Sequence, residues 1–559
     1  MNKVFKLKLN REILRFAQDD KFFGRIWGAV MRKALSFPHH CSPVCLPGSP
    51  VISNGAKRNE KSPCFVPNFI LKHLCALCGF FFGFLFLLLS CKDVHRQVEE
   101  IDNYPPISPD YINVTIPYNI APLNFRMPEE CDRIEVQFTG KMNSFSVKGK
   151  NKVIIPPKKW KRLLDEKKGD SVSVTVTAFG DGRWVKYKPF SLYVSADKID
   201  SYLSYRLIEP GYEVYNKLQI CQRNLENFNE NVIIDNNLLD GGCINCHTYN
   251  FQDPSRSFFH LRHKQGGTMI QEDGRFRKTD TATDSTISAG VYGNWHPGDR
   301  YIAFSTNVII PEFHSINNLR LEVYDTISDV IVLDLEKNEI IQSRLLSDPN
   351  SFETFPAFSA DGSRLFFCSA KAVSMPENYR SAKYSLCSIA FDHVSGTFGD
   401  VIDTLVSSLK TGKTLSEPKS SPDGKYILYT SFDNGNFPVW HKEADLHLLR
   451  LADLYTDTLP EVNSGHADSY HSWSSNNRWF VFASKRDNGM YGKLYFAHLD
   501  ENGKSCKPFL MPQKDPDFYD FFMKSYNIPE LSHEPVTFTP YDVRRAFRKL
   551  PAEQVKLRE

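Results

Sequence analysis

A repeated pattern in the second half of the chain limits the possible folds more than any other feature. Each copy is a polar turn followed by a continuous apolar run that ends in Ser. We interpret such a run as a strand buried on both faces, because a half-buried strand would alternate polar and apolar residues. The copies recur every 50 to 65 residues or so, at 295–305, 358–369, 420–431 and 473–484.

Further strand candidates lie between the copies, for example at 330–335 and 446–451. One buried strand with two or three flanking strands per repeat is the composition of a propeller blade. The run Ser-Pro-Asp-Gly-Lys at 421–425 resembles the turn of TolB-like, or tricorn-type, β-propeller repeats. This resemblance implies a propeller over 285–515, and residues 256–290 are a candidate for a further blade.

The region before the repeats also favours strands. Aromatic residues make up 13% of the chain, and they suit a pleated, half-buried surface. Short alternating runs within 104–196 predict a small immunoglobulin-like β-sandwich. The predicted fold class is therefore mostly β, with a sandwich, an intervening segment and a TolB-like propeller. The remaining boundaries are a tether at 92–103, a partly helical connector at 197–240, the intervening segment at 241–284 and a C-terminal tail at 516–559.

An uncharged apolar run at 74–90 follows Lys72 and His73 and precedes Cys91. A short apolar segment after basic residues is typical of a secretory signal. Its ending, Leu-Leu-Ser-Cys, resembles a bacterial lipobox, which implies lipidation of Cys91 and a signal peptide at 66–91. A retained membrane-spanning helix is the alternative, although the run is short for that role. Because the signal lies far from Met1, we interpret residues 1–65 as a spurious extension of the reading frame.

Cys243, Cys246 and His247 form the pattern Cys-x-x-Cys-His. With 13 Cys and 16 His in 559 residues, chance would produce it roughly 0.01 times per chain. Two thiols at this spacing can bond to the two vinyl groups of one haem, and the adjacent His can then reach the iron. The sequence therefore predicts one covalent haem c, with Cys243 and Cys246 as attachment residues and His247 as proximal ligand. The intervening segment at 241–284 is then a haem-attachment segment. A Cys₂His zinc site and a redox-active or disulfide-bonded Cys pair are the alternatives.

The distal iron ligand is left open by the sequence. His260 and Met269 are both candidates, and His260 is the first choice because it stands beside a hydrophobic strand in Phe-Phe-His. His263 is a weaker candidate. Two further cysteines, Cys368 and Cys387, could lie on neighbouring strands, either as a disulfide or as buried free thiols.

The haem motif and the repeats together resemble a Bacteroidetes family of exported TolB-like proteins that carry a cytochrome c signature. The resemblance includes the segments 116–125, 211–213, 243–247, 259–260, 266–268, 285–295 and 470–474. It implies a covalent haem and a propeller. The signal and the lipobox predict an exported protein that is lipid-anchored at the cell envelope, facing the periplasm or exposed on the cell surface.

The predicted function is one-electron transfer or haem-based sensing by a lipid-anchored monohaem cytochrome. A non-catalytic envelope scaffold with a structural haem and a haem enzyme with an open distal site are the alternatives. Predicted partners are a redox protein, an envelope protein or polysaccharide at the propeller, and the membrane through the lipid anchor. The net charge of +3 gives no case for nucleic acid.

Overall fold

The computed structural model describes residues 97–209, 217–316 and 319–558. The predictions for residues 1–65, for the signal peptide at 66–91 and for lipidation at Cys91 lie outside these residues. Within them, no helix is long and apolar enough to cross a lipid bilayer. The described chain is mostly β, as the sequence predicts.

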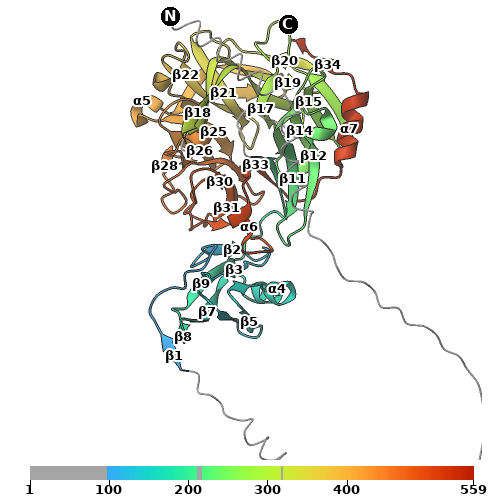
Figure 1. The fold of residues 1–559 in the computed structure, drawn as a ribbon. Helices are drawn as coiled ribbons and strands as arrows, with labels where there is room; N and C mark the ends of the chain where they lie inside the picture. Colours follow the sequence, from blue (N-terminus) through green and yellow to red (C-terminus); the bar gives the residue numbers. More distant parts are fainter. Residues whose placement is uncertain (1–96, 210–216, 317–318, 559) are drawn as a thin grey trace, which may run out of the picture. The chain divides into compact units, whose positions relative to one another are not determined.

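Six sheets of four or five strands fill the part of the described chain from residue 202 onward (Figure 1). We number them as blades in chain order. Blade 1 contains β10 (Tyr202–Ile208), β11 (Leu218–Asn224), β12 (Glu230–Asp235) and β33 (Ser525–Ser532). Blade 2 contains β13 (Cys243–Asn250), β14 (Asp253–Arg262), β15 (Gly267–Glu272), β16 (Arg275–Asp280) and β34 (Glu553–Gln554). Blade 3 contains β17 (Gly290–Trp295), β18 (Tyr301–Ile316), β19 (Leu319–Asp334), β20 (Glu339–Ile341) and β35 (Lys556–Leu557).

The other three blades have four strands each. Blade 4 contains β21 (Ser351–Phe358), β22 (Arg364–Lys371), β23 (Ser385–Asp392) and β24 (Thr397–Val406). Blade 5 contains β25 (Thr414–Ser420), β26 (Tyr426–Phe432), β27 (Asp445–Arg450) and β28 (Tyr455–Asp457). Blade 6 contains β29 (Asp468–Trp473), β30 (Trp479–Ser484), β31 (Lys493–His498) and β32 (Phe509–Leu510).

The innermost strands of neighbouring blades contact one another around a closed ring. The contacts run from β13 through β17, β21, β25 and β29 to β33, and β33 contacts β13 again. Blade 1 is completed by both ends of the ring, because its inner strand β33 comes from the C-terminal region and pairs with β10. This arrangement is a six-bladed β-propeller closed by a strand from the far end of the chain.

The apolar runs of the repeats become the second strands β18, β22, β26 and β30. In β22, Leu365 and Phe367 pack with residues of blade 3, while Phe366 packs with residues of blade 5. Successive side chains point to opposite faces of a strand. Both faces of each blade are covered by a neighbour, which explains why these strands carry no polar alternation.

Three segments differ from the sequence-based assignment. The interval 197–240, interpreted as a connector, holds the outer strands of blade 1. The attachment segment 241–284 forms blade 2, and the tail 516–559 supplies β33 together with the short strands β34 and β35. The tail also contains helix α6 (Phe518–Phe521) and helix α7 (Pro540–Lys549). Short 3-10 helices occur at η1 (Asn236–Leu239), η2 (Tyr379–Ser381) and η3 (Pro438–Trp440), and α5 spans Ser408–Thr411.

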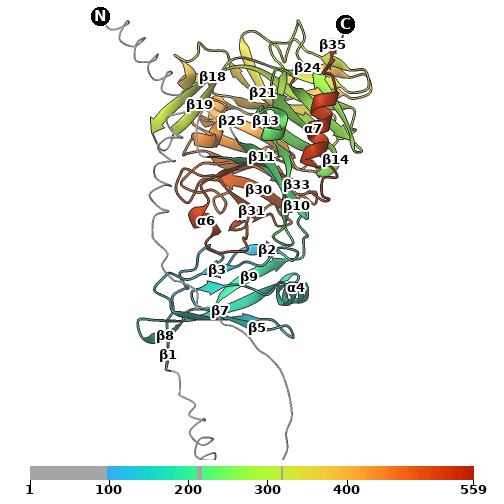
Figure 2. The ribbon, with the colours of Figure 1, turned by 45° about the vertical axis from the view of Figure 1, so that its right-hand side comes forward.

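Helix α7 is held to blades 1 and 2 by its apolar face (Figure 2). Val543, Ala546 and Phe547 are buried in one cluster with residues of β11, β13 and β15. The helix begins with a reciprocal cap, in which the Thr539 side chain accepts from the Asp542 backbone and the Asp542 carboxylate accepts in return. Such a capping box stabilises a helix start by about 1 kcal/mol.

The N-terminal described domain contains the predicted strands and one helix that the sequence did not predict. Its main sheet joins β1 (Val98–Glu100), β2 (Thr115–Pro117), β4 (Arg133–Thr139), β5 (Phe145–Gly149), β7 (Asp170–Gly180), β8 (Arg183–Lys186) and β9 (Phe190–Ser195). A second pair joins β3 (Phe125–Arg126) to β6 (Lys152–Val153). Helix α4 (Pro157–Glu166) buries Trp160, Leu163 and Leu164 in the core of this domain.

Candidate functional site

Each innermost strand of the propeller carries the same local distortion. One residue has a positive φ, between 46° and 55°, next to a shift in strand register. The six residues are Cys246, Tyr292, Phe355, Glu417, Tyr470 and Ile528. This conformation is costly for residues other than Gly, at about 1–3 kcal/mol each. Bulges of this kind re-aim side chains and are frequent beside active sites.

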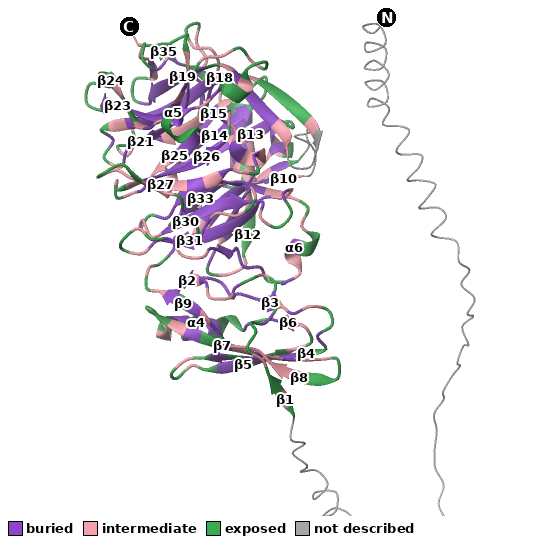
Figure 3. Ribbon diagram, turned by 90° about the vertical axis from the view of Figure 1, so that its left-hand side faces the viewer, coloured by how far each residue is buried: buried purple, intermediate pink, exposed green. Residues whose placement is uncertain are grey.

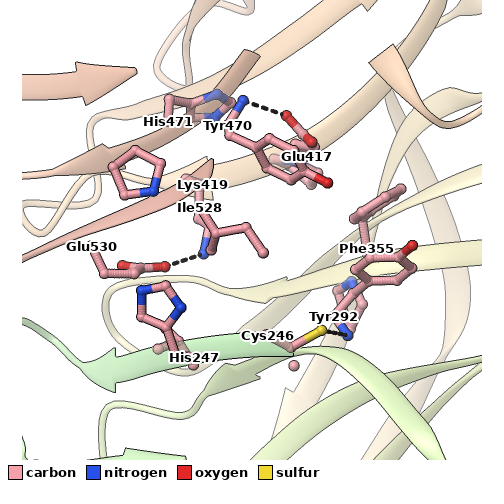
Figure 4. Close-up of a pocket in the computed structure, with 15 residues that line it drawn as sticks. Cys246, His247, Tyr292, Phe355, Glu417, Lys419, Tyr470, His471, Ile528 and Glu530 are labelled. Atoms are coloured by element: carbon pink, nitrogen blue, oxygen red, sulfur yellow. Dashed lines mark hydrogen bonds and ion pairs between the residues drawn. The ribbon is translucent and has the colours of Figure 1, made fainter. Parts of the chain in front are cut away.

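The six distorted residues surround one cavity in the centre of the ring (Figure 4). It is small, about 70 Å³, and His247, Lys419, His471 and Glu530 also line it. Lys419 Nζ lies 3.3 Å from Glu530 Oε1. The Cys-x-x-Cys-His segment therefore reaches the ring interior through Cys246 and His247, which occupy the bulge of blade 2.

Glu417 is an acidic group inside this ring. Its Oε2 accepts hydrogen bonds from the backbone N of Tyr470 at 2.8 Å and from Thr430 Oγ1 at 3.2 Å. Its Oε1 has no hydrogen-bond partner. Burial raises the pKa of Glu417 to about 7, against the effect of these donors. The side chain can therefore gain or lose a proton near neutral pH.

His247 is buried with both ring nitrogens unsatisfied. The residue is 4% exposed. Its ring comes close to the backbone of Ser204, but neither Nδ1 nor Nε2 makes a hydrogen bond of normal geometry. Burial lowers the pKa of His247 to about 3, and the nearby Arg206 lowers it further, so the imidazole is neutral. A neutral, buried imidazole without partners is suited to bind a metal ion.

The two cysteines of the motif have different surroundings. Cys246 Sγ accepts a hydrogen bond from Tyr292 N at 3.4 Å and faces the ring interior. Cys243 Sγ accepts from Asn245 Nδ2 at 2.9 Å and belongs to the apolar cluster of blades 1 and 2. Burial raises the pKa of the Cys246 thiol, and the neighbouring Cys243 adds to this effect. Cys246 therefore faces the ring interior beside His247, whereas Cys243, three residues earlier in the same strand, faces the apolar cluster between blades 1 and 2.

The two candidate distal ligands lie elsewhere in blade 2. His260 is paired with Asn245 and Thr268, and its Nδ1 is 3.4 Å from Thr268 Oγ1. Met269 is paired with Phe259, one position along, so its side chain lies on the opposite face of the blade. Neither side chain lines the cavity that His247 lines. His263 is exposed and contacts the ring of Phe547.

The described residues bear on the zinc and disulfide alternatives for the cysteines. Among them, no group of three or more His, Cys, Asp and Glu side chains is arranged to hold a metal ion. Cys243, Cys246, Cys368 and Cys387 are all free thiols. Cys368 and Cys387 do lie on neighbouring strands, but Cys368 faces Leu386 and Cys387 faces Phe367. The two thiols therefore point to opposite faces of blade 4.

A second, larger cavity adjoins the ring interior. Its volume is about 420 Å³, within the ~300–1,000 Å³ common for small-molecule and cofactor sites. Cys246, Tyr292, Tyr470 and Ile528 line both cavities. We call this larger space the mouth cavity. The sequence analysis did not find it, because its walls come from blades far apart in the chain.

A long hairpin forms part of the wall of the mouth cavity. Strands β18 and β19 have 16 residues each, whereas β22 has eight. Ile309, Pro311, Leu321 and Val323 of this hairpin line the cavity. Strand β18 is buried inside the blade and exposed at Pro311 to Phe313, toward the far end of the hairpin (Figure 3), whereas Leu319 to Leu321 of β19 are half-buried.

The hairpin is fastened to blade 5 by His441. The Nε2 of this buried side chain lies 2.8 Å from Glu322 Oε2 on β19, and its Nδ1 lies 3.1 Å from Glu443 Oε1. Asn436 Nδ2 also donates to Asp325 on the same strand. The 441–445 segment therefore links blade 5 to the long hairpin of blade 3.

We expect this link to make the stability depend on pH. Burial alone would lower the pKa of His441, but the two carboxylates outweigh it and raise the pKa to about 9. A folded-state pKa above the ordinary value means that the stabilisation is complete below about pH 6.5 and is lost as the pH rises through about 9. His441→Gln should therefore lower the melting temperature by several degrees at pH 6 and by little at pH 10.

The control for this prediction is His533→Gln, which changes an exposed histidine. The melting temperatures of the wild type and of both variants are measured at pH 6, 8 and 10 by monitoring thermal unfolding with circular dichroism. An equal loss of stability at pH 6 and pH 10 would show that His441 acts through packing and not through its charge.

Solved structures similar to this chain share 11–12% of its sequence. No protein-family model matches the sequence, and no curated protein matches it. A solved oligogalacturonate lyase in complex with manganese is 11% identical, covering 56% of this chain and 73% of the lyase, with a TM-score of 0.31. The tricorn protease is 11% identical, covering 61% of this chain and 34% of the protease, with a TM-score of 0.30.

A third similar structure is the periplasmic gluconolactonase PpgL of Pseudomonas aeruginosa. It is 12% identical, covering 56% of this chain and 96% of the gluconolactonase, with a TM-score of 0.31. All three TM-scores are below 0.5, so the fold assignment rests on the sheet order and on the closed ring of inner strands. The described chain from residue 202 onward is a β-propeller whose Cys-x-x-Cys-His segment lies at the centre of the ring.

Proposed function

We propose that this protein is an exported, lipid-anchored cytochrome with one covalent haem c. Cys243 and Cys246 would hold the haem by thioether bonds, and His247 would be its axial ligand. The observation that carries the proposal is His247, a buried imidazole with two unsatisfied nitrogens beside Cys246 at the centre of the ring. A bound haem would supply one-electron redox chemistry, or an iron that binds a small molecule.

The residues around this site have roles of their own. The apolar and aromatic walls keep water away from the imidazole, which holds it in its neutral, metal-binding form. Glu417, with a pKa of about 7, offers a proton acceptor or donor inside the same ring. Haem-based sensing or one-electron transfer at the envelope would use this enclosed position, with the propeller binding a partner.

The position of the candidate distal ligands favours an open iron site. Neither His260 nor Met269 lines the cavity of His247, and His471, which does line it, has its Nε2 2.8 Å from the backbone O of Leu428. We therefore expect the reduced protein to have the spectrum of a five-coordinate haem and to bind carbon monoxide. This outcome supports sensing or catalysis over simple electron transfer. Visible spectra of the reduced protein, recorded with and without carbon monoxide, test this expectation.

Two variants and the reduction potential distinguish the remaining alternatives for the distal ligand and for the role of the haem. A six-coordinate spectrum that becomes five-coordinate in His260→Ala, but not in Met269→Leu, would identify His260 as the distal ligand and favour electron transfer. A reduction potential beyond the range of cellular donors would favour the structural-haem alternative.

A further inference from the structure

The mouth cavity has an excess of positive charge. Glu209 is the single acidic side chain among the described residues that line it, and its Oε1 is already 2.7 Å from Lys524 Nζ. Four basic side chains line the same cavity: Arg206, Arg262, Arg320 and Lys485. A low-dielectric cavity with this balance of charges attracts an anion.

Lys485 is the buried basic group of this cavity. It is 5% exposed, and its Nζ lies over the ring of Trp440. Within the described part of the chain, Nζ has no hydrogen-bond acceptor, and no carboxylate pairs with it. Burial, and then the nearby Arg320, lower the pKa of Lys485 well below its ordinary value, because a buried ammonium group without an acceptor is costly. The anionic group of a ligand beside Nζ would remove that cost and favour the charged form.

Arg206 places a second cation beside the Cys-x-x-Cys-His segment. It projects from β10, and its Nη1 donates to the backbone O of Ile244 at 3.4 Å. Its Nε has no hydrogen-bond partner, and it forms no ion pair within the described residues. The guanidinium group therefore has donors left for a carboxylate, which it can bind with two parallel hydrogen bonds.

The remaining walls suit a flat apolar body. Aromatic side chains from six segments line the cavity, together with aliphatic residues of the β18–β19 hairpin. The aromatic residues are Tyr292, Phe313, Phe437, Trp440, Tyr470, Tyr491 and Tyr526. Flat aromatic side chains contribute large apolar contact areas against a planar ligand.

We propose that the mouth cavity binds a flat apolar ligand through its carboxylates, and that Lys485 and Arg206 hold these carboxylates. Cys246 lines the same cavity. The source of these carboxylates depends on the proposed function. If that function holds, they are the propionates of the protein's own haem. A separate carboxylate ligand is the other source, and it would be recognised by the same two side chains.

The test uses the full chain with Cys243→Ser and Cys246→Ser, which leaves the cavity without a covalent group. Protoporphyrin IX and its dimethyl ester are the probes, because they differ only in their two carboxylates. Binding is measured by quenching of tryptophan fluorescence. Lys485→Met and Arg206→Gln are added to this background, and Lys410→Met, an exposed lysine outside the cavity, is the matched control.

We expect the dicarboxylate to bind about tenfold more tightly than the ester, as charged hydrogen bonds would provide. Lys485→Met and Arg206→Gln should each remove most of this preference, and Lys410→Met should keep it. Equal binding of the two probes to the double serine variant itself would overturn the proposal, and this comparison does not depend on the folding of Lys485→Met or Arg206→Gln.

Porphyrin binding to the wild-type chain shows whether the carboxylates come from the protein's own haem or from a separate ligand. It also separates failure of the carboxylate site from failure of the cytochrome proposal. If it carries a covalent haem and no longer binds the added porphyrin, the haem propionates occupy the site. If it carries haem and still binds the porphyrin, the ligand is a separate molecule. A wild-type chain without haem, beside a serine variant that prefers the dicarboxylate, would contradict the proposed function and leave the carboxylate site standing.

Discussion

Replacing Cys243 and Cys246 together by serine is expected to abolish covalent haem in a chain exported by a host with a c-haem maturation system. The thioether bonds require thiols, and serine cannot form them. Each single variant should keep one bond and shift the pyridine haemochrome band relative to the two-bond form. Intact mass and the haemochrome spectrum together measure both effects.

Cys506→Ser is the matched control, because Cys506 is a half-exposed thiol outside both cavities. It should leave the haem content unchanged. A double serine variant with the same covalent haem as the wild type would remove both cysteines from the attachment site. Loss of the haem in Cys506→Ser as well would point to failed folding rather than to a lost bond.

Ending the chain after Lys524 is expected to destroy cooperative folding. The truncation removes β33, the inner strand of blade 1, and with it the buried side chains of Tyr526 and Leu531. Loss of one large buried side chain typically costs about 2–5 kcal/mol, and a domain is stable by only about 5–15 kcal/mol in total. The edge of β10 would also lose its hydrogen-bond partner.

Ending the chain after Lys549 is the control for this truncation. That chain keeps β33 and α7 but loses the short outer strands and Arg558, whose Nη2 lies 2.8 Å from the buried Asp334. Asp334 keeps Arg300 at 2.7 Å, so we expect a modest fall in melting temperature and a preserved transition. A cooperative transition at the wild-type temperature after truncation at Lys524 would contradict the closure of the ring by β33.

The sequence predicts the second strand of four blades because these strands are buried on both faces and therefore read as unbroken apolar runs. The second strands of blades 1 and 2 do not follow this pattern. Strand β14 begins Asp-Pro-Ser-Arg after Phe251 and Gln252, both in the positive-φ region, and lacks the Asp-Gly turn of the later repeats. The pairing of β33 with β10 joins the two ends of the ring, and local patterns carry no information about such a distant partner.

The candidate site also has one part that the sequence predicts and one part that it does not. The spacing of Cys243, Cys246 and His247 is local, and it is enough to select them from the sequence. The mouth cavity depends on β10, on the long hairpin and on Lys485 after β30, which only the ring brings together. A signal for the bulge was present, because Cys246-His247 occupies the position of Tyr470-His471 in the later repeat.

The measurement that tests the account most directly is the intact mass of the exported full chain, combined with its pyridine haemochrome spectrum after denaturation. The account predicts a mass increase of one haem and a spectrum of the two-thioether type. A protein of unmodified mass, with no haem after denaturation, would contradict the cytochrome proposal. The chain would then be a β-propeller with free thiols at Cys243 and Cys246.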